Sequence, residues 1–255
     1  MYKLYATLID GFQDYLSSSD IYQEYWGFSE NPSKTEEDFE AEQFQSLIDR
    51  INRVPFQSEA ADRGTAFNEV VDCIIDKRTS EKMDIASNKT ENTIKAVYHE
   101  QDFVFPLSET VSFAKQYEGA LTQQYTEAIL NTRYGDVLLY GYIDELMPFS
   151  VHDIKTTSKY KTGKFRKHWQ KVVYPYCLKE NGINIDTFSY DVVLWSYDKK
   201  SFSTFKEIYQ FKPKDVAELV DIVERLICFL EANRGLISDL KVFGEETDSQ
   251  DVKVA

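Results

Sequence analysis

The chain has 255 residues, of which 42% are hydrophobic and 15% aromatic, enough to bury a substantial core. No apolar run approaches the eighteen or so residues that span a bilayer, and the N-terminus lacks a basic signal-peptide region, so we expect a cytoplasmic protein. A net charge of −14 argues against a protein that coats nucleic acid with a uniformly basic surface. Three widely spaced cysteines argue against a disulfide framework or a zinc site and are expected in the core.

The first half of the chain reads mainly as helices. Apolar residues at helical spacing predict one helix within residues 1–28, an exposed one over 36–52 and a third over 63–78. Residues 77–92 are polar and are expected to form an exposed excursion. Residues 93–107 are expected to be extended, and a helix capped by Ser108 should follow over 108–121.

The second half alternates strands and helices. Three strands are predicted over 122–132, 137–147 and 150–159, followed by a helix over about 165–180 that contains Pro175. Two more strands, at 186–198 and 202–211, precede a long amphipathic helix over 212–236. The pattern predicts an α/β or α+β fold around a mixed β-sheet. We expect one domain over 1–255, with a helical N-terminal elaboration (1–60), a core (63–236) and a polar tail (243–255).

A short stretch, "GYIDELMPFSVHDIKTTSKY", places acids across a hairpin. With the turn at Pro148–Phe149, Met147 lies opposite Ser150 and Asp144 opposite Asp153, with Cβ atoms roughly 5 Å apart. Because side chains alternate along a strand, Lys155 shares a face with Asp153. Facing carboxylates repel, and either a shared proton or a hard cation such as Mg²⁺ relieves the repulsion. A surface hairpin with an ordinary Asp153–Lys155 salt bridge is the alternative.

The stretch that follows this hairpin is basic although the chain as a whole is acidic. Between Asp153 and Glu180 there is no acid, while eight lysines and arginines occur there. A concentrated basic segment can bind an anion such as a phosphodiester backbone. The basic residues that we expect to contact it are Lys159, Lys161, Lys164, Arg166 and Lys167.

Together these features resemble the PD-(D/E)XK nuclease superfamily, in its RecB-like and phage-exonuclease branch. "GYIDEL" and "VHDIKTT" are similar to its hairpin motif, Asp followed by Asp or Glu-x-Lys. "HWQKVVYPY", with Gln170 and Tyr174, is similar to its Q-x-x-x-Y helix, and "RGTAFNEVVD" to its upstream G-x-x-x-H-E helix. The resemblance covers roughly residues 63–195. Asn68, followed by Glu69, stands where the family usually has histidine, which favours Mg²⁺ over Mn²⁺.

The resemblance implies a restriction-endonuclease-like core and a metal-dependent deoxyribonuclease, most simply an exonuclease on linear DNA in phage or bacterial recombination and repair. It implies that Asp144, Asp153 and the Ile154 carbonyl hold the metal, with either Asn68 or Glu69 completing the site. Lys155 would assist the attacking water, and Gln170 would contact that water or the substrate. Tyr174 would join the basic residues at the DNA.

The resemblance also suggests binding partners, and the sequence leaves two other interpretations open. By family analogy, a single-strand annealing protein or a helicase is the natural partner, and the chain could form a homo-oligomer. Because Asn68 departs from the motif, a DNA-end-binding module without strong catalysis is a second hypothesis. An unrelated α/β protein with an accidental motif is a third, and it predicts that Asp144 and Asp153 lie far apart.

Overall fold

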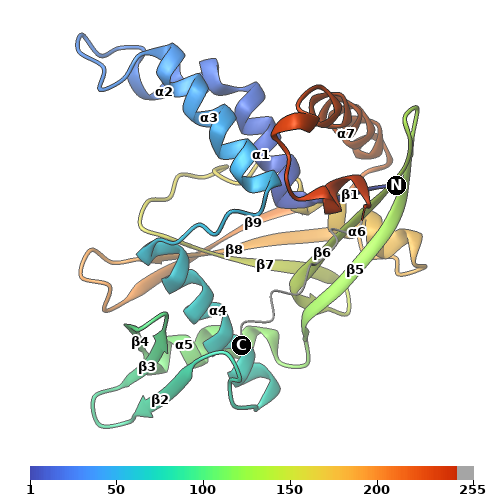
Figure 1. Ribbon diagram of the computed structural model, residues 1–255. Helices are drawn as coiled ribbons and strands as arrows, with labels where there is room; N and C mark the ends of the chain where they lie inside the picture. The colour runs from blue at the N-terminus through green and yellow to red at the C-terminus, as the bar shows by residue number, and fades with distance from the viewer. Residues whose placement is uncertain (246–255) are drawn as a thin grey trace, which may run out of the picture.

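The centre of the protein is a mixed β-sheet of six strands, in a computed structural model that describes residues 1–245 (Figure 1). The strand order is β1-β6-β7-β8-β9, and β5 pairs with the other edge of β6. Strands β1 and β6 are parallel, as are β7 and β8, while the remaining pairs are antiparallel. The strands are β1 (Tyr2–Tyr5), β5 (Leu121–Thr132), β6 (Gly135–Met147), β7 (Ser150–Thr157), β8 (Thr187–Trp195) and β9 (Phe202–Gln210). The predicted α/β fold around a mixed sheet is confirmed.

Four helices build the larger hydrophobic core with one face of this sheet. They are α1 (Ala6–Leu16), α3 (Glu36–Ile51), α6 (Gln170–Glu180) and α7 (Pro213–Ala232). The predicted 36–52 helix forms because Thr35 caps its N-terminus, accepting a hydrogen bond from the Asp38 N–H, and three acids occupy its first turn. Helix α2 (Ser18–Trp26) packs on α3, and the two project from the body (Figure 1).

A second core lies on the opposite side of β7 and β8. There Phe67, Val70 and Val71, the predicted apolar face of the third helix, pack in one cluster with Ile154 and Trp195. The elements on this side are α4 (Glu59–Asp76), β2 (Asp84–Asn88), β3 (Thr93–Tyr98), β4 (Gln101–Pro106), α5 (Leu107–Ala114) and the 3₁₀ turn η1 (Lys115–Tyr117). Strands β2, β3 and β4 form a separate antiparallel sheet.

Two sequence predictions about local structure are wrong, and a third, the exposed excursion over 77–92, is incomplete. Residues 2–5, expected to be helical, form β1, whose Leu4 is fully buried and which pairs with β6. The polar excursion contains β2, which gains its hydrogen bonds from β3. Ser108 does not cap α5, since Pro106 is the N-cap residue and the Ser108 hydroxyl instead donates to the Asn92 side chain at 2.6 Å.

The expected helix over 165–180 begins only at Gln170, so the basic residues before it lie in a loop. Pro175 lies inside this helix, as expected. Two short turns, η2 (Arg234–Leu236) and η3 (Leu240–Phe243), follow α7. Phe243, the first residue of the predicted polar tail, is buried, and residues 246–255 of that tail lie outside the described residues.

Two predictions about composition can be compared with residues 1–245. In this range no helix combines the length and the apolar composition needed to cross a bilayer. All three cysteines are free thiols. Only Cys177 is a buried core residue, since Cys73 is partly exposed and Cys228 is exposed, so the core assignment is right for one of the three.

Candidate active site

The register of the β6–β7 hairpin is the one predicted from the sequence. Met147 pairs with Ser150, and Glu145 pairs with His152. Beyond Glu145 the two strands separate, and the Asp144 carboxylate fills the gap by accepting a hydrogen bond from the Ile154 N–H at 2.9 Å. On its other side Asp144 also lacks a strand partner, because Gln123 of β5 adopts a left-handed conformation with φ of 48°. Backbone irregularity of this kind gathers at functional sites.

Asp153, Lys155 and Gln170 form a closed polar cluster beside this gap. The Lys155 Nζ lies 2.8 Å from Asp153 Oδ2 and donates to Gln170 Oε1, also at 2.8 Å. The Gln170 amide in turn donates to Asp153 Oδ1, and more weakly to the Tyr174 hydroxyl at 3.3 Å. Asp153 is only 2% exposed, so this cluster is a buried ion pair with a bridging amide. The structure thus brings four predicted residues, Asp144 included, to one place.

Burial and charge set the protonation states in this cluster. Burial, followed by the negative charge of Asp153, raises the pKa of Asp144 to about 8. Burial lowers the pKa of Lys155, but the nearby charges of Asp153 and Asp144 outweigh it, so its pKa is raised overall. Lys155 is therefore a fixed ammonium ion near neutral pH, suited to stabilise an anion and unsuited to accept a proton.

The C-terminal half of helix α4 carries two buried acids, Glu69, which the sequence predicts as a site residue, and Asp72, which it does not. Both carboxylate oxygens of Glu69 are engaged by basic side chains, with Arg78 Nη1 at 2.6 Å and Lys82 Nζ at 3.2 Å. These partners hold the pKa of Glu69 down at about 2, against the effect of burial. One turn beyond Asn68, the Asp72 side chain is 1% exposed, and its Oδ1 is buried without a hydrogen-bond partner among residues 1–245.

Asp72 interacts electrostatically with the hairpin acids. Burial, and then the charge of Glu69, raise the pKa of Asp72 to about 7. Its charge contributes in turn to the raised pKa of Asp144. Asn68 is partly exposed, and its Oδ1 is also buried without a partner in the described chain. The i, i+4 spacing of Asn68 and Asp72 puts both on one helix face, which is the sequence signal that could have identified Asp72.

A second buried polar group lies behind the hairpin. Glu145 is fully buried, neither of its oxygens has a hydrogen-bond partner in residues 1–245, and burial raises its pKa well above the usual value. Its strand neighbour His152 lies 2.6 Å from Asp191, which also accepts from the Tyr117 hydroxyl at 2.7 Å. His152 is therefore a half-buried histidine whose two ring nitrogens have partners, Ser150 and Asp191.

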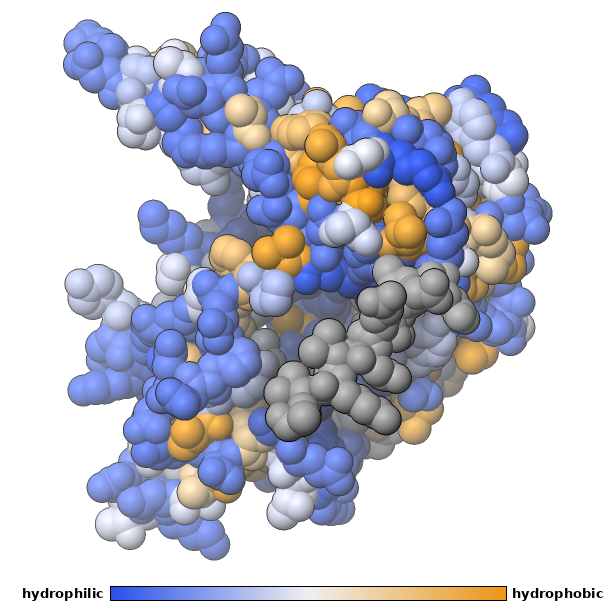
Figure 2. Space-filling view, in the orientation of Figure 1, coloured by the Kyte–Doolittle hydropathy of each residue, from blue (hydrophilic) through white to orange (hydrophobic). Residues whose placement is uncertain are grey.

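The expected DNA-contacting residues divide into two groups. Lys159, Lys161, Lys164, Arg166 and Lys167 are exposed in the loop between β7 and α6. Glu207 of β9 anchors that loop by accepting from the Gly163 N–H and the Tyr160 hydroxyl, both at 2.9 Å. Figure 2 shows a hollow between the projecting α2–α3 pair and the lobe around α4, and the loop runs along it in Figure 1. Tyr174 is only 5% exposed, so its predicted contact with DNA is wrong in this structure; it packs beside Gln170.

The start of α6 is held by an acid that the sequence did not reveal. Asp10 of α1 is 8% exposed and accepts a hydrogen bond at 2.6 Å from the N–H of Trp169, the N-cap residue of α6. Burial raises the pKa of Asp10 to about 7. The neighbouring His168 is partly buried, and burial lowers its pKa to about 4.

The donor set fits a hard divalent cation held by few protein ligands. In residues 1–245 no three His, Cys, Asp or Glu side chains gather as a ready metal cage. Mg²⁺ commonly takes one or two carboxylates and keeps its remaining ligands as water or phosphate. A cation beside Asp144 and Asp153 would offset the repulsion that, after burial, contributes to the raised pKa of Asp144.

Comparisons with known proteins add little to this geometry. No protein-family model matches the chain, and no curated protein matches it. The crystal structure of SSO0001 is similar over 46% of this chain and 54% of its own length, at 16% sequence identity. The chain thus spans about half of that protein. The TM-score is 0.33, a likeness too low to carry an argument about function.

Proposed function

We propose that this protein is a metal-dependent deoxyribonuclease of the PD-(D/E)XK type. One observation carries the proposal: four residues of two separate sequence motifs meet in one cluster, Asp153 and Gln170 buried and Asp144 and Lys155 half-buried. A surface salt bridge would not need a bridging glutamine, nor a second acid within electrostatic reach. The further assignment to an exonuclease acting on linear DNA rests on the sequence resemblance alone.

In the proposed reaction each side chain has a role that follows from its charge and contacts. A bound Mg²⁺ would supply Lewis-acid stabilisation of the phosphate and a more acidic water. Lys155 is a buried ammonium and would stabilise the charge that develops on the phosphate oxygens. Gln170 is hydrogen-bonded to both Lys155 and Asp153 and would keep both side chains positioned against the substrate. The cations of the β7–α6 loop would neutralise neighbouring backbone phosphates.

Digestion assays on the purified chain test this proposal. Linear and closed circular DNA, each single- and double-stranded, are incubated with Mg²⁺ or with EDTA. We expect degradation with Mg²⁺ only, and its loss in Asp153→Asn, which keeps the shape of the side chain, and in Lys155→Met. Asp136→Asn, at an exposed acid of the same strand, is the matched control and should digest like the wild type. Equal digestion by all four proteins would refute the assignment, and cutting of circular DNA would refute the exonuclease.

Variants of the two buried acids in the C-terminal half of α4, Asp72 and Glu69, can be compared in the same digestion assay. If Asp72 rather than Glu69 serves the site, Asp72→Asn should slow Mg²⁺-dependent digestion by tenfold or more, a typical loss for a group near the metal. Glu69→Gln should act on stability instead, because it weakens the ion pairs to Arg78 and Lys82. The reverse pattern would favour the assignment made from the sequence.

A DNA-end-binding module without turnover is the second candidate. The absence of a ready cage of three metal-ligating side chains in residues 1–245 favours it. Wild-type protein that binds linear DNA but leaves it intact with Mg²⁺ and with Mn²⁺ would establish this alternative.

A further inference from the structure

Arg63, near the start of α4, is a cation without a partner. Among residues 1–245 no acceptor binds its guanidinium, and its Nε and Nη1 atoms are buried. The guanidinium carbon lies 5.3 Å from the Phe103 ring centroid, 5.8 Å from that of Phe105 and 5.7 Å from that of Trp195. Aromatic rings hold the side chain in place but accept no strong hydrogen bonds, so its donors remain available.

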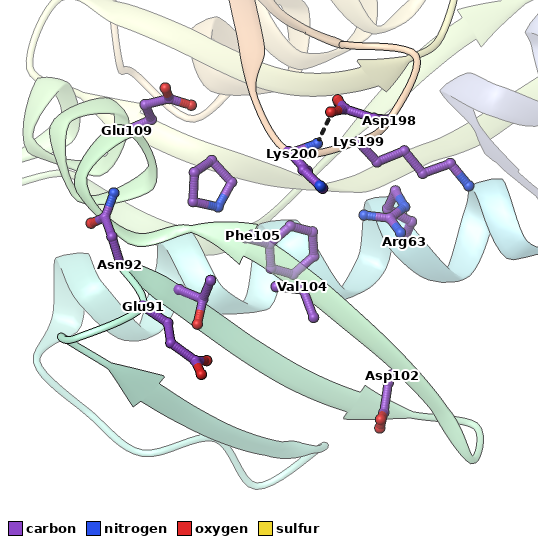
Figure 3. Close-up of a pocket in the computed structure, with 12 residues that line it drawn as sticks. Arg63, Glu91, Asn92, Asp102, Val104, Phe105, Glu109, Asp198, Lys199 and Lys200 are labelled. Atoms are coloured by element: carbon purple, nitrogen blue, oxygen red, sulfur yellow. Dashed lines mark hydrogen bonds between the residues drawn. The ribbon is translucent and has the colours of Figure 1, made fainter.

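Arg63 lines two neighbouring pockets that differ in charge. One, drawn in Figure 3, also contains four acids, namely Glu91, Asp102, Glu109 and Asp198, beside Lys199 and Lys200. The other has a volume of about 630 Å³ and contains Arg63, Lys159 and Lys199 with the single acid Glu59. Glu59 is already paired with Lys199, so the second pocket has uncompensated positive charge from Arg63 and Lys159.

The rest of the second pocket is suited to a flat ring. Trp195 forms part of its wall, and the buried Nε1–H of this indole lacks an acceptor in the described chain. Tyr197, in the turn between β8 and β9, lines the same pocket and is fully exposed to solvent. An exposed tyrosine next to a cation is a combination on which nucleic-acid bases stack.

The pocket lies at the end of β7, the strand that carries Asp153 and Lys155. Thr156 and Thr157, the two residues after Lys155, line it. Two residues of a strand cover roughly 7 Å, which is about two steps of a DNA strand along a duplex axis. Gly64 lets α4 approach the strand there, because a Cβ at this position would lie 2.9 Å from Thr156 Oγ1. Arg63 is thereby fixed close to the end of the strand that carries Lys155.

We propose that this pocket holds one nucleotide of the DNA strand that is cut, with its phosphate at Arg63 and Lys159 and its base on Tyr197. The inference rests on the proposed function and adds a substrate-binding subsite to it. A phosphate offers acceptors to the free donors of Arg63, and the base offers a face to the tyrosine. The volume falls in the range typical of small-molecule sites.

Equilibrium binding separates this subsite from the catalytic centre. A fluorescein-labelled single-stranded 12-mer is titrated with full-length protein at several salt concentrations, and Ca²⁺ replaces Mg²⁺ to prevent hydrolysis. Arg63→Met keeps the packing on the aromatic rings and should weaken binding about tenfold, with the slope of log K against log salt reduced by about 0.7. Arg63→Lys should retain the slope. Tyr197→Ala should weaken binding about fivefold and leave the slope unchanged.

Two controls make the result decisive. Lys89→Gln removes an exposed positive charge from the turn between β2 and β3 and should leave affinity and slope unchanged. Oligonucleotides with one methylphosphonate at successive linkages should reveal a position at which wild-type binding weakens and Arg63→Met binding does not. Wild-type affinity and slope in both Arg63→Met and Tyr197→Ala would overturn the subsite while leaving the nuclease proposal intact. If the wild type binds no DNA at all, both proposals fail. If Arg63→Met does not fold, DNA binding by Arg63→Lys and Tyr197→Ala, together with the methylphosphonate series, tests the subsite instead.

Discussion

The clearest physical consequence of the site is that its acids destabilise the metal-free protein. Asp144 is held near Asp153 by the hairpin and by its hydrogen bond from the Ile154 N–H. An Asp144→Asn substitution keeps an oxygen that can accept this bond but removes the charge. We therefore expect Asp144→Asn to be more stable than the wild type in the absence of divalent metal.

The pKa of Asp144 sets the size and the sign of this effect. Burial and the charge of Asp153 raise this pKa from 3.8 to about 8, so the folded protein binds the proton more tightly than the unfolded chain. The associated stability is fully present below about pH 4 and is lost as the pH rises to about 8. At about 1.4 kcal/mol per pKa unit the shift implies several kcal/mol. Solvent screening of a half-buried group reduces this to about 2 kcal/mol.

Thermal unfolding in EDTA at pH 5 and at pH 8 measures the effect. For a chain of this size about 2 kcal/mol corresponds to about 5 °C, so Asp144→Asn should melt about 5 °C above the wild type at pH 8 and much less above it at pH 5. Asp136→Asn, on the exposed part of the same strand, should show no such gain. If Asp144→Asn melts at or below the wild-type temperature at pH 8, the two carboxylates do not repel as described. Added Mg²⁺ should raise the wild-type melting temperature and leave that of Asp144→Asn nearly unchanged.

Three further substitutions test other parts of the site. Lys155→Met should reduce digestion at least a hundredfold. It should also lower the free energy of unfolding by about 3 kcal/mol, because it leaves a buried aspartate unpaired. Digestion within threefold of the wild type would contradict the catalytic role of Lys155. Asp10→Ala removes the acceptor of the Trp169 N–H and should lower the stability measured by thermal unfolding by about 1–3 kcal/mol. Asp10→Asn keeps an acceptor and should recover at least half of that stability. Equal losses in the two variants would show that the hydrogen bond is not the cause. Glu207→Ala should release the loop 158–169, so that trypsin cleaves it several-fold faster by mass spectrometry, and an unchanged cleavage rate would refute the anchoring.

The sequence predicted those parts of the structure that depend on local periodicity. Alternating burial along β6 and β7 and a turn at Pro148–Phe149 determine the hairpin register, since a slip by one residue would expose the apolar face of each strand. The same applies to Phe67, Val70 and Val71 of α4, whose spacing alone places them in the core. Lys155 and Gln170 come from adjacent elements, so their proximity follows from a β-strand and a helix that pack together.

The missed features depend on contacts that the local sequence pattern does not indicate. The spacing of the acids along α4 does not reveal that Arg78 and Lys82, basic residues after the helix, engage Glu69. Nothing near Asp10 in the sequence indicates that it binds a backbone N–H of Trp169, 159 residues away. Strand β1 has only four residues, too few for a period-2 pattern to stand out beside the helix that follows.

The position of β1 also bears on how the protein is made. Residues Tyr2–Tyr5 are synthesised well before their partner on β6, Val137–Tyr140, which follows more than 130 residues later. At ordinary rates of translation this delay is on the order of 10 s. Throughout it, Leu4 and the apolar face of α1 lack the sheet that later covers them. The apolar residues of β1 and α1 thus stay uncovered during this delay, and completion of the central sheet has to wait for the hairpin that carries Asp144.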